Sequence, residues 1–299
     1  MKILAIFTGG TISCSEKNGV LSPDGSNSFL LLKSRPDAEY ETAVPYTVLS
    51  ENTGLTELEK LFGTVYENLL GDYDGIIVAH GTDTLQFTAA FLAQKLGLCR
   101  TPVVMVSANY PLSDSRSNGF ENFGAAVDFI ASKQGRGVFV SYKNSGAEFA
   151  EIHRGGELLA HASYSDALSS LDGNVYGRVA NGVFIPNKNY IERCNEAGNK
   201  NSLSGRVMWL RAHPGMIYPP LTGEVKAVLL EGYHSGTLNT DGNELRAFCA
   251  SARKSDIPLY LTGCEEGFNY ESKSMFESLN IIVLPKMPPV TAYIKLWLK

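Results

Sequence analysis

Short runs of apolar residues alternate along this chain with longer segments whose hydrophobic residues recur every three to four positions. The short runs have the composition of buried strands, and the longer segments have the period of helices that bury one side. Before residue 150, the strand-like runs lie at 2–7, 75–79, 101–106 and 136–142. The helical segments lie at 58–69, 84–96 and 118–131. This alternation predicts right-handed crossovers and a mainly parallel sheet.

A polar segment rich in Asn, Lys and Glu, residues 187–204, interrupts the pattern. Strand-like runs resume after it at 207–210, 225–230, 259–262 and 281–284. The 299 residues are enough for two domains of ordinary size. We therefore expect an α/β protein with a larger N-terminal domain (1–186), whose mainly parallel sheet is flanked by helices. A linker (187–204) would join it to a smaller C-terminal α/β domain (205–299).

Charge and cysteine content narrow the class of protein. The net charge is −5 and no Lys/Arg cluster stands out, which argues against a nucleic-acid partner. The apolar stretch after Met1 is too short for a signal peptide or a membrane span. The five cysteines are scattered without a CxxC pair, a pattern typical of reduced thiols in a cytoplasmic protein. No spacing joins the five histidines into a metal site.

Two threonine-bearing turns carry the candidate chemistry. Thr8-Gly-Gly-Thr11 follows the first strand-like run, and His80-Gly-Thr-Asp-Thr84 follows the run at 75–79. In open α/β sheets, ligands bind just outside the carboxyl ends of the strands, so both turns should face a ligand. Gly10 and Gly81 allow close approach of the backbone and offer N–H donors of the kind that an oxyanion hole requires.

The hydroxyls and the carboxylate of these turns suggest nucleophilic catalysis. Thr11 and Thr82 would lie at the tips of the turns, with Asp83 placed to bind an ammonium group or to orient a base. A threonine hydroxyl becomes a useful nucleophile only when another group removes its proton. Taken singly, each turn also fits a nucleotide-binding or a purely structural role. The lysine of a phosphate loop and the GxGxxG pattern are both missing from the first turn, which counts against nucleotides.

Together, the two motifs resemble those of the L-asparaginase family of the bacterial type I/II fold. The order and spacing of Thr8–Ile12 and His80–Thr84 are specific to that family. Four further segments resemble parts of the same family, so the resemblance covers almost the whole chain. These segments are Ser107–Pro111, Arg116–Gly119, Arg211–Met216 and Met287–Trp297.

The resemblance implies a two-domain enzyme that hydrolyses the side-chain amide of asparagine, or of glutamine, to the acid and ammonia. It implies a small-molecule amino-acid substrate and no metal or organic cofactor. Thr11 would be the nucleophile that accepts the acyl group, and Thr82 would be the second catalytic threonine. Asp83 would bind the α-amino group of the substrate.

Other substrate contacts are implied in the same way. Asn52 and Thr53 fall where the family contacts the substrate α-carboxylate, and Ala108 falls where a backbone carbonyl meets the substrate amide. Thr237 falls where a neighbouring protomer completes the site. The resemblance therefore implies a homodimer or homotetramer with shared active sites.

Two positions depart from the family pattern, and both fall on catalytic residues. Val20 stands where the family has a loop tyrosine that helps to activate the nucleophile, and His161 stands where it has a lysine. Lys143 is the nearest lysine upstream, but it comes too early in the pattern. One interpretation of His161 is a polar loop residue without a catalytic part. The other is a base acting with Thr82 and Asp83, because imidazole exchanges protons near neutral pH.

Several functions stay open on this interpretation. The favoured one is an asparaginase-type amidohydrolase. A catalytically attenuated amino-acid-binding homologue is suggested by Val20 and His161, and the changed loop also fits an amidase for a modified asparagine. A component that supplies ammonia to a transfer-RNA amidotransferase is disfavoured, because such a component normally has an extra N-terminal domain and this sequence begins at the first strand.

Overall fold

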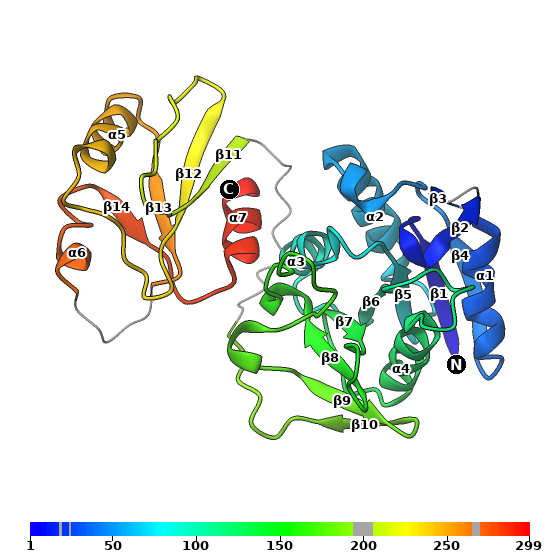
Figure 1. The fold of residues 1–299 in the computed structure, drawn as a ribbon. Helices are drawn as coiled ribbons and strands as arrows, with labels where there is room; N and C mark the ends of the chain where they lie inside the picture. Colours follow the sequence, from blue (N-terminus) through cyan, green and yellow to red (C-terminus); the bar gives the residue numbers. More distant parts are fainter. Residues whose placement is uncertain (18–19, 24, 194–205, 265–269) are drawn as a thin grey trace. The chain divides into compact units, whose positions relative to one another are not determined.

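The computed structural model describes residues 1–17, 20–23, 25–193, 206–264 and 270–299. The chain divides into two compact units, Met1–Asn199 and Lys200–Lys299 (Figure 1), and each is considered separately. Two residues of the predicted linker are hydrogen-bonded to the body of the first unit. Asn187 Nδ2 donates to the Val175 carbonyl, and the Ile191 N–H donates to Asn174 Oδ1. Most of the remaining linker lies outside the described residues, so its boundaries stay a prediction.

The first unit is built on an eight-stranded sheet in the order β10-β9-β8-β7-β6-β5-β1-β4. Five neighbouring strands are parallel: β1 (Lys2–Phe7), β4 (Glu39–Ala43), β5 (Gly75–Ala79), β6 (Val103–Val106) and β7 (Val138–Tyr142). The other three extend the sheet in antiparallel fashion: β8 (Ala150–Arg154), β9 (Gly177–Ala180) and β10 (Val183–Pro186). A separate hairpin consists of β2 (Cys14–Lys17) and β3 (Val20–Pro23). The predicted α/β fold is confirmed.

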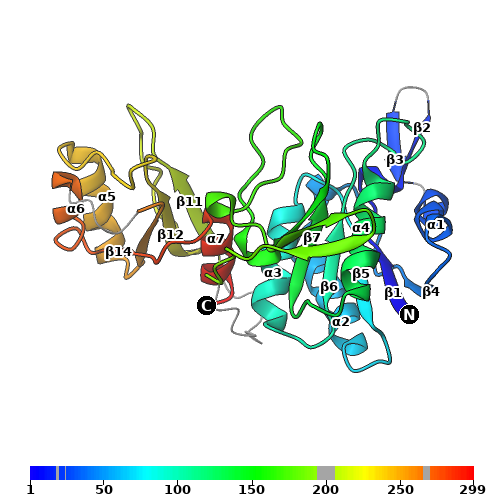
Figure 2. The same cartoon turned by 90° about the horizontal axis from the view of Figure 1, so that it is seen from below.

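Helices cover both faces of the parallel strands (Figures 1 and 2). Ile3, Ala5 and Phe7 of β1 pack in one core with residues of α1 and α4, and that core includes no residue of α2 or α3. Because side chains alternate along a strand, Leu4 and Ile6 face the opposite side. Strands β1, β5, β6 and β7 are buried on both faces and read as continuous apolar runs, which is why they could be predicted, whereas the partly exposed edge strand β4 was not. The helices are α1 (Gly25–Ser34), α2 (Leu55–Asn68), α3 (Leu85–Leu96) and α4 (Gly119–Ala131).

One crossover has the opposite hand to the others. The steps from β5 to β6 and from β6 to β7 move in the same direction across the sheet, yet α3 and α4 lie on opposite faces. These two crossovers therefore differ in hand, and the connections through α1 and α2 share the hand of α3. Parallel crossovers are right-handed in about 98% of cases, which makes β6–α4–β7 the left-handed one. The expectation of right-handed crossovers is wrong for this connection.

The antiparallel strands β8 to β10 were not predicted. Their sequences mix charged and apolar residues, and β8 buries His153 and Arg154 completely. The His153 ring bonds through Nδ1 to Ser170 Oγ at 2.8 Å, and an Arg154 nitrogen donates to the Arg136 carbonyl at 2.7 Å. Burial of such residues depends on partners elsewhere in the chain, which a local pattern does not reveal.

The strand order reverses direction between β1 and β5. From β1 the chain continues toward β4 at one edge, whereas from β5 it continues toward β6 and β7 on the other side. The crevice at the carboxyl ends of two such strands is where open α/β sheets bind ligands. Both threonine-bearing turns begin there, because β1 ends at Phe7 and β5 ends at Ala79.

The second unit has a parallel sheet in the order β11-β12-β13-β14. Its core packs α5 against one face and α7 against the other. The strands are β11 (Arg206–Arg211), β12 (Val225–Glu231), β13 (Leu259–Thr262) and β14 (Ile281–Val283), close to the predicted runs. The helices are α5 (Asn243–Lys254), α6 (Glu271–Ser274) and α7 (Pro289–Trp297).

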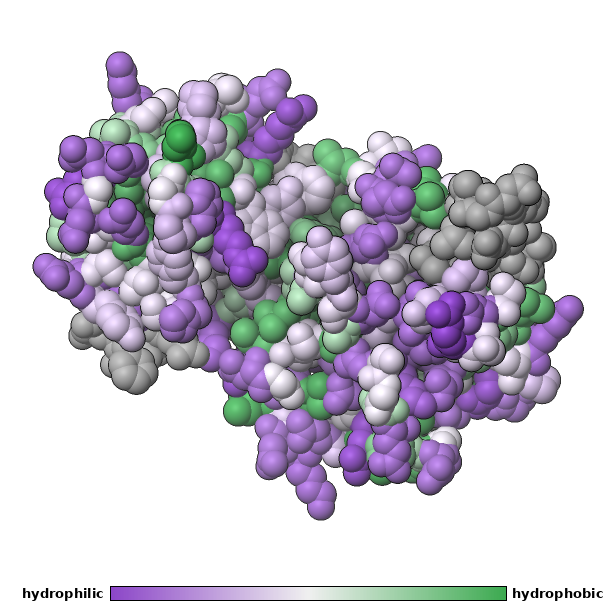
Figure 3. Space-filling view, viewed as in Figure 1, coloured by the Kyte–Doolittle hydropathy of each residue, from purple (hydrophilic) through white to green (hydrophobic). Residues whose placement is uncertain are grey.

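The face drawn in Figure 3 is largely hydrophilic. In the space-filling view (Figure 3), hydrophilic residues are spread over the visible face and apolar ones occur in small groups among them. Scattered apolar side chains of this kind are ordinary at a protein surface. Within the described part of the chain, no helix combines the length and the apolar character needed to cross a membrane.

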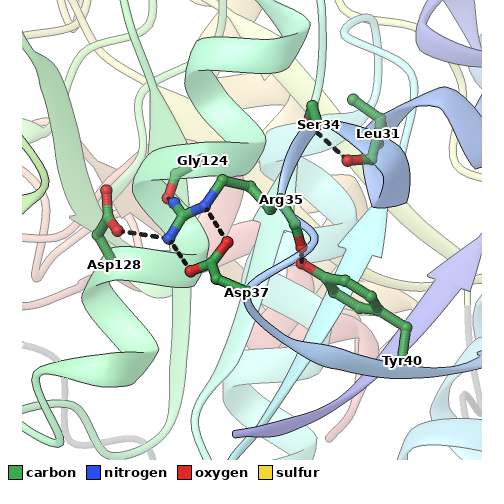
Figure 4. Close-up of polar contacts among 7 residues, drawn as sticks. All are labelled: Leu31, Ser34, Arg35, Asp37, Tyr40, Gly124 and Asp128. Carbon is green, nitrogen blue, oxygen red and sulfur yellow. Dashed lines mark hydrogen bonds and ion pairs between the residues drawn. The ribbon is translucent and has the colours of Figure 1, made fainter.

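Arg35 ties the end of α1 to α4 (Figure 4). Its guanidinium donates two hydrogen bonds to Asp37 at 2.9 and 2.8 Å, one to the Gly124 carbonyl at 2.7 Å, and pairs with Asp128 at 2.8 Å. The hydrogen bonds from Arg35 lower the pKa of Asp37 to about 2. Because α1 precedes β4, this cluster fixes how the chain returns to the sheet edge.

Replacing Arg35 by methionine keeps the aliphatic stem and removes every one of these bonds. We expect the free energy of unfolding to fall by about 1–3 kcal/mol, mostly from the Gly124 and Asp128 contacts, since Asp37 is largely exposed and screened. In the same variant the pKa of Asp37 should return to about 3.9. Urea unfolding and NMR titration of the carboxylate measure the two effects. Lys33→Met, on the exposed side of α1, is the control; equal stability of the two variants would contradict the assignment.

Candidate active site

The two threonine-bearing turns start level with each other on adjacent strands. Phe7 pairs with Ala79 in the β1–β5 register. The Thr8 N–H and its hydroxyl both donate to the Ala79 carbonyl, at 3.1 and 2.9 Å. The His80 N–H donates to the Val106 carbonyl at 2.9 Å, which joins the second turn to β6. The sheet register therefore brings the two motifs side by side.

Beyond the strand ends, the backbones of the two turns touch. A Cβ placed on Gly10 would lie 2.3 Å from the Cα of Gly81, and the φ of Gly10 is +75°. A Cβ on Gly81 would lie 2.4 Å from Ser50 Oγ. No other residue fits at Gly10 without a shift of the backbone. The Gly10 N–H donates to the Val48 carbonyl at 2.9 Å, so what this glycine contributes here is the close approach of the turns.

Ser50 is a member of the site that sequence reasoning missed. It is 4% exposed and opens a short 3-10 helix, Ser50–Asn52. Its hydroxyl donates to Asp83 Oδ2 at 3.1 Å, and its carbonyl accepts the Thr84 hydroxyl at 2.9 Å. Ser50 thus orients Asp83 and holds the segment of Asn52 and Thr53 against the second turn. In the sequence, Ser50 stands two positions before Asn52, the first of the predicted carboxylate-binding residues. That proximity was the signal that could have identified it.

A cavity of about 390 Å³ opens beside Thr82 and Asp83, at the start of α3. His161 lines the same cavity, although it lies far beyond these residues in the sequence. The structure therefore assembles the hydroxyl, carboxylate and imidazole that the sequence suggested. The full lining is Thr82, Asp83, Gln86, His161, Ala162, Ser163, Tyr164, Ser165 and Asp166.

The hydrogen bonding of His161 leaves one ring nitrogen as an acceptor. Nδ1 lies 3.2 Å from the Ala167 carbonyl oxygen. A carbonyl oxygen can only accept, so Nδ1 carries the proton of the neutral ring and Nε2 has a free lone pair. Nε2 is buried and has no hydrogen-bond partner among the described residues. The neutral ring therefore keeps one acceptor that the described residues do not use, which a general base needs.

The backbone around Ala108 is held by two asparagines of the α4 N-terminus. Asn118 and Asn109 exchange side chain–backbone hydrogen bonds at 3.0 Å each. Asn122 Nδ2 donates to the Ser107 carbonyl at 2.8 Å, and its Oδ1 accepts the Lys143 N–H at 2.7 Å. These bonds fix the end of β6, where Ala108 is fully buried.

Not every predicted site residue is brought to the cavity. Thr11 begins a short 3-10 turn, Thr11–Ser13, and the placement of its side chain lies outside the described part of the structure. Asn52 is exposed, and Thr53 Oγ1 is buried without a hydrogen-bond partner among the described residues. The Lys143 ammonium pairs with Glu121 at 2.5 Å. Thr237 belongs to the second unit, where its hydroxyl lies 3.0 Å from Ser235 Oγ, so its role between protomers stays a prediction.

His80 is a structural member of the second turn. Its Nδ1 lies 2.8 Å from the Gly81 carbonyl and must donate to it, which leaves Nε2 to accept from the Thr88 hydroxyl at 3.1 Å. Complete burial lowers the pKa of His80 to about 4. The ring therefore stays neutral and links the turn to the body of α3.

The polar groups of the site are of four kinds. Across the ranges that the structure covers, no group of three or more His, Cys, Asp or Glu side chains is arranged to hold a metal ion. The polar groups around the cavity are hydroxyls, carboxylates, one amide and one imidazole. This set suits acid–base and nucleophilic chemistry on an organic substrate.

Comparison with known proteins gives the class to which this fold and site belong. Residues 2–190 match the family model described as asparaginase, N-terminal. This is more than half of the chain. The chain belongs to the asparaginase family of hydrolases, and the resemblance seen in its motifs is confirmed.

Individual relatives carry two different names. The chain is 26% identical over 312 residues to a glutamyl-tRNA(Gln) amidotransferase subunit of Methanosphaera stadtmanae, covering 97% of this chain and 70% of that protein. It is 25% identical over 277 residues to the L-asparaginase of Thermococcus kodakarensis, covering 86% of this chain and 79% of that protein. At these identities, both relatives are equally consistent with the family to which this chain belongs.

Solved structures agree on the fold. The thermostable L-asparaginase from Thermococcus kodakarensis is similar with a TM-score of 0.81 at 21% identity, covering 99% of this chain and 92% of that one. A probable cytoplasmic L-asparaginase from Campylobacter jejuni gives a TM-score of 0.74 at 20% identity, covering 99% of this chain and 94% of that one. At such identities the likeness concerns the fold alone.

The contact between the turns predicts the effect of a single methyl group. Gly10→Ala should lower the free energy of unfolding by at least about 2 kcal/mol, because it adds left-handed strain and a backbone clash. Gly63→Ala is the matched control: Gly63 lies inside α2 with nothing within 4 Å of a new Cβ, so this change should stabilise by about 0.5–1 kcal/mol. Urea unfolding measures both. Similar stability of the two variants would contradict the close approach.

Burial of His80 predicts a pH dependence of stability. His80 takes up a proton near pH 4 in the folded chain, against about 6.5 in the unfolded chain. Between these values the unfolded state binds more protons, so the free energy of unfolding falls as the pH is lowered from about 6.5 to about 4. Buried His153, with a pKa also lowered to about 4, adds in the same direction. NMR titration of the histidine rings checks the cause; a His80 signal that titrates near pH 6.5 would refute it.

Proposed function

We propose that this protein is an L-asparaginase that hydrolyses the side-chain amide of asparagine to aspartate and ammonia, with glutamine as a second substrate to be tested. The observation that carries the proposal is the cavity shared by Thr82, Asp83 and His161 at the end of the parallel strands. Membership of the asparaginase family supports the same reaction class.

The proposed reaction proceeds through an acyl-enzyme. The Thr11 hydroxyl attacks the amide carbon of the substrate, the amide nitrogen leaves as ammonia after gaining a proton, and water then cleaves the ester to release the acid. His161 accepts through Nε2 the proton that the attacking Thr11 hydroxyl loses and returns it to the leaving nitrogen, with the Thr82 hydroxyl as its neighbour in the cavity. Asp83, oriented by Ser50, binds the α-ammonium of the substrate.

The departures at Val20 and His161 also fit an attenuated homologue that binds an amino acid without turnover. The cavity that His161 shares with Thr82 and Asp83 supports catalysis over this alternative, because it places an imidazole in the same pocket as the hydroxyl and the carboxylate. An amidase acting on a modified asparagine uses the same chemistry and differs only in what the cavity admits.

A second candidate is a component of a transfer-RNA amidotransferase. It is favoured by the similarity to amidotransferase subunits, including a glutamyl-tRNA(Gln) amidotransferase subunit of Methanobrevibacter smithii at 29% identity over 321 residues, which covers 98% of this chain and 71% of that protein. For such a component, ammonia release would depend on a partner protein. An isolated asparaginase would instead turn over free asparagine.

We propose that the protein is cytoplasmic and forms a homodimer or homotetramer. In this assembly, Thr237 of one protomer completes the site of another. The free thiols of Cys249 and Cys264 support a reducing compartment.

Ammonia release from purified protein tests the proposal. The wild type should release ammonia from L-asparagine, and Thr82→Val and His161→Gln should each lower kcat by about 10²–10⁴-fold. Thr64→Val, a hydroxyl loss on α2 away from the cavity, is the control and should leave kcat unchanged. His161→Lys should keep part of the activity and move the rising limb of the pH–rate profile upward, because an alkylammonium holds its proton more firmly than an imidazolium.

Three outcomes separate the alternatives. Unchanged turnover in His161→Gln would remove the histidine from the mechanism. A thermal shift with L-aspartate but no ammonia from any amide supports the attenuated binder. Release from N4-substituted asparagines in preference to asparagine supports the amidase for a modified substrate.

A further inference from the structure

Gln86 lines the cavity but has no part in the mechanism described so far. It is the second residue of α3, one helical turn beyond Asp83, and it is 3% exposed. A glutamine is rarely buried this far without hydrogen bonds to both ends of its amide. The way in which this amide is bonded is therefore informative.

Only one end of the Gln86 amide is bonded within the described part of the protein. Nε2 donates to the Asp83 carbonyl at 3.2 Å. Because a carbonyl only accepts, the nitrogen must be on this side, and the orientation of the amide is fixed. Oε1 is buried and has no hydrogen-bond partner among the described residues. A buried acceptor left in this state lowers stability, and beside a cavity a ligand can supply the missing donor.

The neighbours of Gln86 specify the kind of donor. Asp83 Oδ2 already accepts the Ser50 hydroxyl, which leaves Oδ1 for a ligand. The cavity lining contains a second carboxylate, Asp166, and its described members include no lysine or arginine. A ligand group that is positively charged and offers more than one N–H suits this wall best. A primary ammonium, with three N–H donors, meets both conditions.

We propose that Gln86 Oε1 is a second acceptor, beside Asp83 Oδ1, for the α-ammonium of the substrate. The inference rests on the proposed function in that it takes the cavity as the site for an amino-acid amide. It makes Gln86 a specificity-determining residue: the site selects amides with a free α-amino group over otherwise identical amides and acids without one.

Binding of two matched ligands tests this selectivity without any turnover. L-aspartate and succinate differ by the α-ammonium, and isothermal titration calorimetry gives the affinity for each. The wild type should prefer L-aspartate. Gln86→Met, which keeps the length of the side chain, should weaken L-aspartate binding by about 10- to 100-fold, the effect of one hydrogen bond to a charged group, and leave succinate binding unchanged.

Two further variants keep the outcome interpretable. Gln94→Met removes another buried glutamine of α3, two turns beyond Gln86 and outside the cavity lining, and should change neither affinity. Gln86→Glu keeps an acceptor at the position and should keep the preference for L-aspartate. Equal affinity of the wild type for the two ligands overturns the proposal even if Gln86→Met does not fold. Equal losses for both ligands in Gln86→Met, or no loss, overturn it as well.

Failure of the proposed reaction would look different. A protein that prefers L-aspartate through Gln86 but releases no ammonia from L-asparagine retains the ammonium site and lacks the hydrolytic activity. Conversely, a protein that releases ammonia equally well from L-asparagine and from succinamate is an amidase whose cavity ignores the α-ammonium. The two proposals can thus fail independently.

Discussion

The backbone contact between Gly10 and Gly81 is the constraint on which the site depends. It forms because β1 and β5 end level with each other, so that the turns that follow have no room for side chains between them. Ser50 packs against Gly81 and bonds to Asp83 and Thr84. The positions of Thr82 and Asp83 are therefore set by sheet register and backbone packing, which vary less than side-chain rotamers do.

Around this fixed point, most polar groups are satisfied by the protein and a few are left for a ligand. Asp83, Ala108 and His80 are each held by hydrogen bonds of neighbouring residues. Gln86 Oε1 and His161 Nε2 are buried acceptors without partners in the described part of the chain. Other buried atoms without partners among the described residues, such as Tyr142 OH and Thr262 Oγ1, lie outside the cavity lining. Gln86 and His161 differ from these in lining the cavity, which is why their free acceptors bear on a ligand.

Family membership and activity rest on different parts of the molecule. The switch point between β1 and β5, the helical layers and the left-handed β6–α4–β7 connection belong to the fold, and relatives named as L-asparaginases and as amidotransferase subunits share this family. A fold of this kind can support more than one use of the same chemistry. The choice between them depends on the residues of the site and not on the fold.

Local pattern was sufficient for the parallel strands β1, β5, β6 and β7 and for the two turns, because a strand buried on both faces is a continuous apolar run and a turn in contact with another backbone needs glycine. It missed the parallel edge strand β4, whose residues are mostly polar and exposed. The asparaginase resemblance further indicated His161. Pattern was insufficient for β8 to β10, for the hand of the α4 crossover, and for Ser50 and Gln86. Each of these depends on contacts between residues far apart in the chain, such as Ser50 with Asp83 across 33 positions. Such contacts arise only when the packed layers bring those residues together, and neither hydrophobic period nor residue type encodes that distance locally.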